Sequence, residues 1–172
     1  MSYSKLVLLP ALLCSAVAFG QGVPKSAHAD IVNGQGQKIG TAKILPAKKG
    51  VKIEVSVAQL SPGKHGIHIH AVGKCDGPDF KTAGGHLNPE TKKHGKENPE
   101  GPHAGDLLNI EVKADGTAKA TLLDTMVTLG DGANSLFHDG GTAIVIHEKE
   151  DDYKTDPTGN SGGRIACGVI QK

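Results

Sequence analysis

The sequence has no tryptophan, two tyrosines, three phenylalanines and three cysteines in 172 residues, whereas it has 24 glycines. So few aromatic residues and so many glycines favour short strands and turns over helices. No segment keeps a sustained helical period, and there is neither an internal repeat nor a second composition regime. The formal net charge is only +1, so the chain lacks the positive excess that would indicate a nucleic-acid partner or an anionic membrane surface. We therefore predict a single all-β domain.

A long hydrophobic run occurs only at the N-terminus, at Leu6–Phe19. It is too short to span a bilayer comfortably, it follows the basic Lys5, and small residues suited to cleavage end at Ala18 or Gly20. A buried N-terminal helix is the alternative, which the flanking charge and the small residues disfavour. We predict a protein exported to the periplasm or beyond the cell, without a membrane span. Its predicted parts are a signal peptide at residues 1–20, a linker at 21–29 and the domain at 30–172.

Cleavage would remove Cys14 and leave Cys75 and Cys167. Lipidation of Cys14 is disfavoured because Leu13 stands where a small residue normally precedes such a cysteine. In an exported chain the two remaining cysteines most simply form a disulfide, which would close a long loop and stabilise the fold by about 4–5 kcal/mol. A cysteine metal ligand is the weaker alternative, since neither residue has a partner at Cys-x-x-Cys spacing.

Alternating apolar and polar residues predict short strands along the rest of the chain. The clearest is Val51–Val57, in which valine and isoleucine alternate strictly with polar residues. Ser61–Lys64 has the composition of a turn, and residues 130–141 and 151–163 have that of loops. Further strands are expected near residues 39–44, 67–70, 108–112, 117–123, 142–147 and 165–170. We expect about eight strands in the whole domain.

The same alternation places histidines together. In the strand at 67–70 the two isoleucines take one face, so His68 and His70 take the other. In the strand at 142–147 the isoleucines likewise leave His147 on the opposite face. If these strands are neighbours, three histidines converge outside the core. Exposed histidines on a polar face are the alternative, which a His-x-His pair backed by a third histidine disfavours.

The stretch Gly66–Asp106 holds five of the nine histidines, and its second part is rich in Gly, Pro and Lys with almost nothing apolar. Such a segment has too little to bury to order itself within a compact domain. Its His86, His94, His103 and Asp106 supply three imidazoles and a carboxylate, a donor set that suits tetrahedral Zn²⁺. Metal binding would supply the ordering free energy that burial cannot. A solvated loop with accidental histidines is the alternative.

Five short motifs stand out along the chain: Gly66–His70 (GIHIH), Ala83–Pro89 (AGGHLNP), His103–Leu107 (HAGDL), His147–Asp152 (HEKEDD) and Gly159–Ile170 (GNSGGRIACGVI). They resemble the motifs of the copper/zinc superoxide dismutases and occur in that family's order. The last is highly specific, and with the predicted signal peptide the chain resembles the bacterial exported branch. The resemblance implies an all-β, eight-stranded Greek-key barrel or sandwich, Ig-like, with long metal-binding and active-site loops.

The resemblance also implies the metal ligands and the residues that assist them. The implied copper ligands are His68, His70, His86 and His147, and the implied zinc ligands are His86, His94, His103 and Asp106, so that His86 bridges both ions. The implied catalytic residues are His86 and Arg164, the latter guiding the substrate anion. Asp151 would link a copper ligand to a zinc ligand, and Cys75 would pair with Cys167. The histidines without an implied ligand role are His28, His65 and His138.

The expected function is superoxide dismutation, which gives O₂ and H₂O₂ and protects against extracytoplasmic superoxide. The expected cofactors are Cu and Zn, the substrate is the superoxide anion, and a homodimer and a copper-donor protein are left open as partners. A binding module that buffers copper or zinc is one alternative, disfavoured because Arg164 is retained. A zinc hydrolase is another, disfavoured because four zinc ligands predict a closed site.

Overall fold

The computed structural model describes Met1 and residues 22–172, so the predicted signal peptide lies outside the described residues apart from Met1. Within these residues the chain forms nine strands and one 3-10 turn, η1 (Lys81–Ala83). The strands are β1 (Ala27–Asn33), β2 (Lys38–Pro46), β3 (Val51–Val57), β4 (Gly63–His65), β5 (Ile67–His70), β6 (Ile110–Val112), β7 (Ala118–Asp124), β8 (Ala143–His147) and β9 (Arg164–Val169). The all-β prediction is therefore confirmed.

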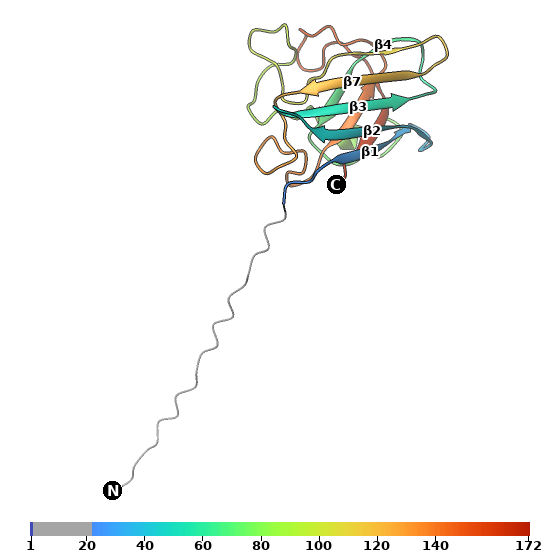
Figure 1. Cartoon of the computed structure of the whole chain (residues 1–172). Helices are drawn as coiled ribbons and strands as arrows, with labels where there is room; N and C mark the ends of the chain where they lie inside the picture. The colour runs from blue at the N-terminus through green and yellow to red at the C-terminus, as the bar shows by residue number, and fades with distance from the viewer. Residues whose placement is uncertain (2–21) are drawn as a thin grey trace.

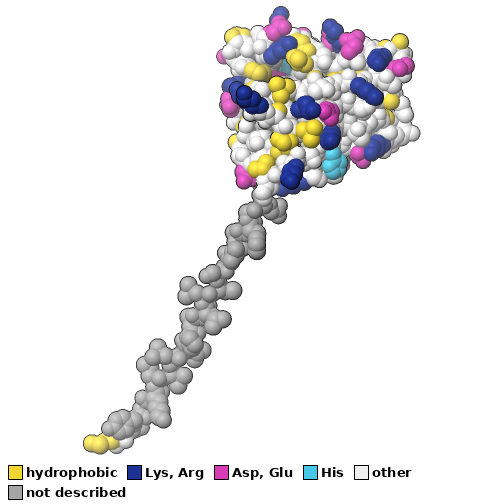
Figure 2. Space-filling view, in the orientation of Figure 1, with side chains coloured by type: hydrophobic (Ala, Val, Ile, Leu, Met, Phe, Trp, Pro, Cys, Tyr) yellow, Lys and Arg dark blue, Asp and Glu magenta, His cyan; other side chains and the backbone are white. Residues whose placement is uncertain are grey.

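Seven strands form one antiparallel sheet in the order β5-β8-β9-β1-β2-β3-β7, and β4 pairs with β6 beside β7. The sheet curls, so that β1, β2, β3 and β7 make one wall and the remaining strands cross behind it (Figure 1). The outer face of this wall carries basic and acidic side chains interspersed, without a field of one sign (Figure 2). No helix in the described part of the chain has the length and apolar character needed to cross a membrane.

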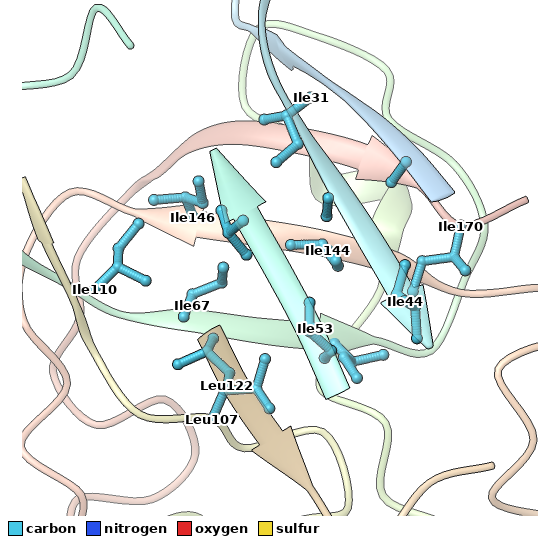
Figure 3. Packing of buried hydrophobic residues seen from close by; sticks show 14 of the residues in the cluster. Ile31, Ile44, Ile53, Ile67, Leu107, Ile110, Leu122, Ile144, Ile146 and Ile170 are labelled. Carbon is cyan, nitrogen blue, oxygen red and sulfur yellow. The ribbon is translucent and has the colours of Figure 1, made fainter. Parts of the chain in front are cut away.

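The core lies between the two walls, and isoleucine is its commonest residue, beside valine, leucine and alanine. Ile44 of β2, Ile53 of β3 and the isoleucines of β5 and β8 are fully buried, and they meet in the centre of the barrel (Figure 3). Burying each such side chain contributes about 1.5–3 kcal/mol. Because a strand's side chains alternate between faces, this packing also fixes which way the other residues of β5 and β8 point.

The strand boundaries differ from the sequence-based expectation in three places. β1 begins at Ala27, inside the expected linker, because its small residues pair with β2 and are buried. The expected turn at Ser61–Lys64 continues into β4, which pairs with β6. Leu108 is 50% exposed and lies before β6, because Leu107 takes the buried position instead.

The predicted disulfide is confirmed. Cys75 and Cys167 are bonded, with Cα atoms 5.6 Å apart and a sequence separation of 92 residues. The bond ties the segment that follows β5 to β9. Buried Phe80 and Val145 pack around Cys167 in a small apolar cluster separate from the main core.

Candidate metal centre

β5 and β8 are hydrogen-bonded neighbours, so they bring their histidines together. His68 and His70 of β5 lie on the face opposite the core isoleucines, and His147 ends β8 on the same side. All three rings are buried, at 0%, 0% and 2% exposed. The alternative of exposed histidines on a polar strand face is therefore wrong.

The histidine-rich loop is anchored to β5 by its own backbone. Leu87 donates to the carbonyl of Ile69 at 2.8 Å, Ile69 donates to the carbonyl of Gly105 at 2.8 Å, and Gly105 donates to that of Leu87 at 2.9 Å. A Cβ at Gly105 would overlap the Ile69 carbonyl, so only glycine allows this close approach. Leu87, Ala104 and Leu107 are also buried. The loop thus has more apolar anchoring at its two ends than its sequence suggests.

Four imidazoles converge on one point beside β5 and β8. One ring nitrogen from each of His68, His70, His86 and His147 lies within 4.8 Å of the others. The atoms His68 Nδ1, His70 Nε2, His86 Nε2 and His147 Nε2 are buried and have no hydrogen-bond partner. Leaving a buried polar atom unpaired costs about 1–3 kcal/mol, so four together indicate an absent partner. Four imidazole nitrogens are donors that suit copper.

A second cluster of donor atoms surrounds Asp106 Oδ1. The Nδ1 atoms of His86, His94 and His103 lie 2.9, 3.0 and 3.2 Å from it, and His103 Nδ1 lies 3.3 Å from His86 Nδ1. Ligands at 2.0–2.1 Å from a tetrahedral Zn²⁺ are separated by about 3.3 Å. The spacing of these four atoms therefore fits zinc.

His68 lies within reach of both clusters, because its ring stacks on that of His86 with centroids 4.0 Å apart. Donor atoms of His68, His86, His94 and Asp106 accordingly lie within 4.8 Å of one another. The hydrogen bonds decide which cluster His68 belongs to. Its Nε2 is engaged by Asp151, and its unpartnered Nδ1 belongs to the four-imidazole group. His86 uses Nε2 in that group and Nδ1 beside Asp106, so it is the residue shared by both.

Asp151 joins the two clusters from behind. Its Oδ2 accepts from His68 Nε2 at 2.8 Å and its Oδ1 accepts from His94 Nε2 at 3.0 Å, with the side chain fully buried. A carboxylate on the outer nitrogen of a ligating histidine fixes the ring's orientation. Gly159 has a positive φ of 64°, and a Cβ there would overlap this carboxylate.

The strand histidines are neutral at physiological pH. Burial, helped by neighbouring imidazoles and Arg164, lowers the pKa of His70 to about 2 and that of His147 to about 3. Burial also lowers the pKa of His86 to about 4, against the opposing effect of Asp106. Because a metal ligand must be deprotonated, these rings are ready to bind.

The loop cluster has the opposite electrostatics. Burial lowers the pKa of His94, but hydrogen bonds to Asp106 and Asp151 outweigh burial and raise it to about 9. For the carboxyl groups of Asp106 and Asp151, burial acts to raise the pKa. The hydrogen bonds from the histidines outweigh burial and hold both pKa values well below the usual range. The two carboxylates are therefore charged and offset the charge of a cation.

Arg164 lies beside the four-imidazole cluster. Its Nη1 donates to the carbonyl of Phe80 at 2.8 Å and its Nη2 to the carbonyl of Gly84 at 2.7 Å. His70 Nδ1 lies 2.9 Å from the same Gly84 carbonyl. The guanidinium is half-buried, which lowers its pKa without removing its charge.

Comparison with known proteins identifies the family. A family profile described as copper/zinc superoxide dismutase (SODC) matches residues 38–170. The chain belongs to the copper/zinc superoxide dismutase family. The chain is 51% identical over 162 residues to superoxide dismutase (Cu-Zn) 1 of Aquifex aeolicus, covering 92% of this chain and 96% of that one. It is 40% identical over 149 residues to superoxide dismutase (Cu-Zn) of Caulobacter vibrioides, covering 85% and 86%.

Solved structures agree with this family membership. A SOD-like protein from Bacillus subtilis superposes on the chain with a TM-score of 0.80 at 42% identity, covering 83% of this chain and 96% of that one. The Cu/Zn superoxide dismutase from Brucella abortus does so with a TM-score of 0.70 at 29% identity, covering 85% and 99%. By family the cofactors are copper and zinc, and the two donor clusters fit them.

The structure also places residues around the centre that the sequence did not single out. His65 is buried, with its two ring nitrogens 2.7 and 2.8 Å from the backbone carbonyls of His147 and Ser61. Asn109 and Tyr153 contact the backbone and carboxylate of Asp151. Tyr153 had one available signal, since it is one of only two tyrosines and lies in a polar loop next to Asp151. Asn109 had none.

Proposed function

We propose that this protein is an exported superoxide dismutase, in which two superoxide anions and two protons give one O₂ and one H₂O₂. One anion is oxidised and the other reduced, so the electrons balance within the substrate. The observation that carries the proposal is the set of four unpartnered buried imidazole nitrogens, with His86 shared between them and the Asp106 cluster.

The metals are assigned to the two donor clusters. The proposed copper ligands are His68, His70, His86 and His147, and the proposed zinc ligands are His86, His94, His103 and Asp106. When bound, copper supplies one-electron redox chemistry and zinc supplies a fixed, redox-silent positive charge. His86 would offer Nε2 to copper and Nδ1 to zinc, and its ring would then carry no proton on either nitrogen.

Arg164 binds and orients the substrate anion. Its guanidinium keeps its charge at any physiological pH, and the carbonyls of Phe80 and Gly84 fix the direction in which its remaining N–H groups point. The same Gly84 carbonyl contacts His70, so the anion is held close to the strand histidines. Arg164 therefore positions the anion and requires no change in its own protonation.

His86 supplies a proton at Nε2. This nitrogen faces the four-imidazole cluster and is buried without a hydrogen-bond partner, so a proton held there while Nε2 is not bound to copper can pass to the reduced anion. A proton delivered from Nε2 to the reduced anion helps to form H₂O₂. Asp151 holds His68 and His94 in orientation and keeps both rings fixed through the cycle.

Export places the enzyme outside the cytoplasm, where it would remove extracytoplasmic superoxide. The support is the sequence of residues 1–20, with Lys5, an apolar segment and small residues at the end. The bond between Cys75 and Cys167 suits an oxidising compartment. Intact-mass measurement of the secreted protein should show a chain beginning after Ala18 or Gly20. A mass that begins at Met1 would contradict export with cleavage. A homodimer and a copper donor remain predictions.

Superoxide decay followed by pulse radiolysis tests the activity. Full-length protein loaded with Cu²⁺ and Zn²⁺ should accelerate the decay in proportion to bound copper, and the stripped protein should not. Metal analysis of the same sample shows whether both ions are bound. Protein that holds both metals and does not accelerate decay would instead support the metal-buffering module.

A further inference from the structure

Tyr153 adopts a backbone conformation that a bulky residue rarely takes. Its φ is 63°, in the left-handed region, which is disfavoured for a residue other than glycine. Such a conformation persists only where surrounding contacts determine it. The contacts of Tyr153 therefore show what the conformation achieves.

The two backbone polar groups of Tyr153 connect the carboxylate behind the metal clusters to the histidine-rich loop. Its N–H donates to Asp151 Oδ1 at 2.6 Å, beside the bond that the same oxygen accepts from His94. Its carbonyl accepts from the N–H of Glu97 at 3.0 Å. One residue thus links the orienting carboxylate with the loop that carries His94.

The hydroxyl of Tyr153 makes a third connection, to a residue that grips the backbone of Asp151. The Tyr153 oxygen accepts from the Asn109 N–H at 2.8 Å. The Asn109 side chain donates from Nδ2 to the Asp151 carbonyl at 2.9 Å and accepts from the Asp151 N–H at Oδ1 at 2.8 Å. Asp151 is therefore held by its backbone through Asn109 and by its carboxylate through Tyr153.

The histidine-rich loop also packs on Tyr153. Lys96 Nζ lies 4.2 Å from the centroid of the Tyr153 ring, within the range of a cation–π contact. A Cβ at Gly95 would overlap the Tyr153 carbonyl, so the two backbones touch. The Gly95 N–H donates to Asp106 Oδ2 at 2.8 Å. Tyr153 therefore contacts both Gly95, which hydrogen-bonds to Asp106, and Asn109, which hydrogen-bonds to Asp151.

We propose that Tyr153 is a positioning residue that sets the zinc donor cluster through Asp151. The hydroxyl fixes Asn109, Asn109 fixes the Asp151 backbone, and the Asp151 carboxylate orients His94. The inference rests on the proposed assignment of zinc to His86, His94, His103 and Asp106. In this proposal the contacts of Tyr153, which is not itself a ligand, hold the zinc donor cluster in its geometry before zinc binds.

Zinc binding to the metal-stripped, full-length protein tests this inference, with Zn²⁺ as the probe and a chromophoric chelator as competitor. Tyr153→Phe keeps the ring over Lys96 and removes only the hydroxyl. It should weaken zinc binding about tenfold, as the loss of outer hydrogen-bond partners of metal ligands does. Thr155→Val is the matched control, because it removes a hydroxyl from the same loop that contacts Asp152 and Asn160. It should change the affinity less than about twofold.

A double-mutant cycle separates positioning from general loop stability. Asp151→Asn alone should weaken zinc binding about 10–100-fold. If Tyr153 acts through Asp151, adding Tyr153→Phe to Asp151→Asn should cost no more than about a further twofold. Asn109→Ala interrupts the same contacts at the Asp151 backbone and should also weaken zinc binding about tenfold. This second variant keeps the test decisive if Tyr153→Phe does not fold.

The outcomes distinguish this inference from the proposed function. Wild-type protein that binds no zinc would overturn both. Wild-type protein that binds zinc while Tyr153→Phe and Asn109→Ala bind it equally well would overturn the positioning role alone. The positioning role would also be overturned if the losses of zinc affinity in Tyr153→Phe and Asp151→Asn were fully additive, or if Thr155→Val lost as much affinity as Tyr153→Phe. Either result would mean that the Tyr153 hydroxyl only stabilises the loop.

Discussion

The two halves of the metal centre are held in place by different forces. The strand half consists of His68, His70 and His147, which the hydrogen-bonded pair β5–β8 presents opposite a layer of fully buried isoleucines. The loop half consists of His94, His103 and Asp106, which lie in a segment with apolar anchors only at its ends. Hydrophobic packing positions the first half, and hydrogen bonds to two carboxylates position the second.

This difference determines the protonation and hydrogen bonding of each half in the metal-free protein. In the strand half the rings are neutral, and one nitrogen of each ring has no hydrogen-bond partner. The packed sheet holds these rings in place although the unpartnered nitrogens are unfavourable. The loop half satisfies its donors internally, with the pKa of His94 raised to about 9 between Asp106 and Asp151. A rigid scaffold can thus leave its ligand atoms free, whereas a loop must use carboxylates to stay ordered.

The largest effect is expected from removing one of the proposed copper ligands of the strand half. His147→Ala leaves the loop half untouched, so zinc should still bind. The mutant should lose copper and with it more than about 100-fold of the dismutation rate, since a lost ligand costs more than a lost outer partner. Metal analysis and superoxide decay on one preparation check both statements. Simultaneous loss of zinc would mean that the halves are not positioned independently.

Breaking the link between the halves should affect both ions. Asp151→Ala removes the carboxylate that holds His68 in one half and His94 in the other. Affinity for each metal should fall about 10–100-fold. Competition titrations with Cu²⁺ and with Zn²⁺ measure the two losses separately. Unchanged retention of both metals would argue against the bridging role of Asp151.

A smaller effect is expected where neither half is disturbed. Arg164→Ala should lower the dismutation rate about tenfold, at the lower end of electrostatic guidance, and should weaken its dependence on salt. Copper and zinc content should stay at wild-type values, because the Arg164 guanidinium donates to the backbone carbonyls of Phe80 and Gly84, and the strand pairing of Arg164 with His147 uses backbone that the substitution keeps. Arg164→Lys, which keeps the charge, is the control and should fall in between. Loss of copper in Arg164→Ala would show that the residue supports the ligands.

A third buried carboxyl sharpens the contrast, because it has no histidine partners. Asp124 is buried with Oδ2 unpaired, and burial raises its pKa from 3.8 to about 6. The folded state therefore binds more protons than the unfolded state between these values, so the free energy of unfolding falls as pH rises from about 4 to 6 and stays reduced at neutral pH. Asp106 and Asp151, whose pKa values are lowered, contribute in the opposite direction.

Asp124→Asn should remove that part of the pH dependence. The shift from 3.8 to about 6 corresponds to at most about 3 kcal/mol of unfolding free energy lost at neutral pH. The buried NH₂ group of the new amide needs a partner, so the mutant should be more stable than wild type at pH 7 by only about 1 kcal/mol. Urea unfolding of stripped wild-type and mutant protein at pH 4 and pH 7 measures the difference. Parallel pH profiles for the two proteins would contradict the raised pKa of Asp124.

Sequence periodicity predicted the strand half well and the loop half poorly. Two-residue alternation was enough to set His68, His70 and His147 on one face, because a strand's geometry is local. The way in which His86, His94 and His103 meet Asp106 has no such period. These four residues were proposed as a zinc site from their donor types, whereas the full copper set and the sharing of His86 came from the resemblance. β4 was not predicted because its partner β6 is distant in sequence. β1 was not predicted because its alanines and polar residues give a weak strand signal, although its partner β2 is the next strand along the chain.

The contacts of Asn109 and Tyr153 were also beyond sequence analysis. Asn109 meets Asp151 across 42 residues and through backbone atoms, so no side-chain pattern encodes the pairing. The left-handed conformation of Tyr153 likewise follows from those contacts and runs against the preference of the residue itself.

The central claim is that His86 belongs to both halves, and electron paramagnetic resonance tests it directly. Co²⁺ is placed in the zinc cluster and Cu²⁺ in the four-imidazole cluster of the full-length protein, and the copper signal is recorded. A shared imidazolate couples the two ions magnetically, so the copper signal should be lost when both are bound. A copper signal of full intensity with both ions present would contradict the bridge.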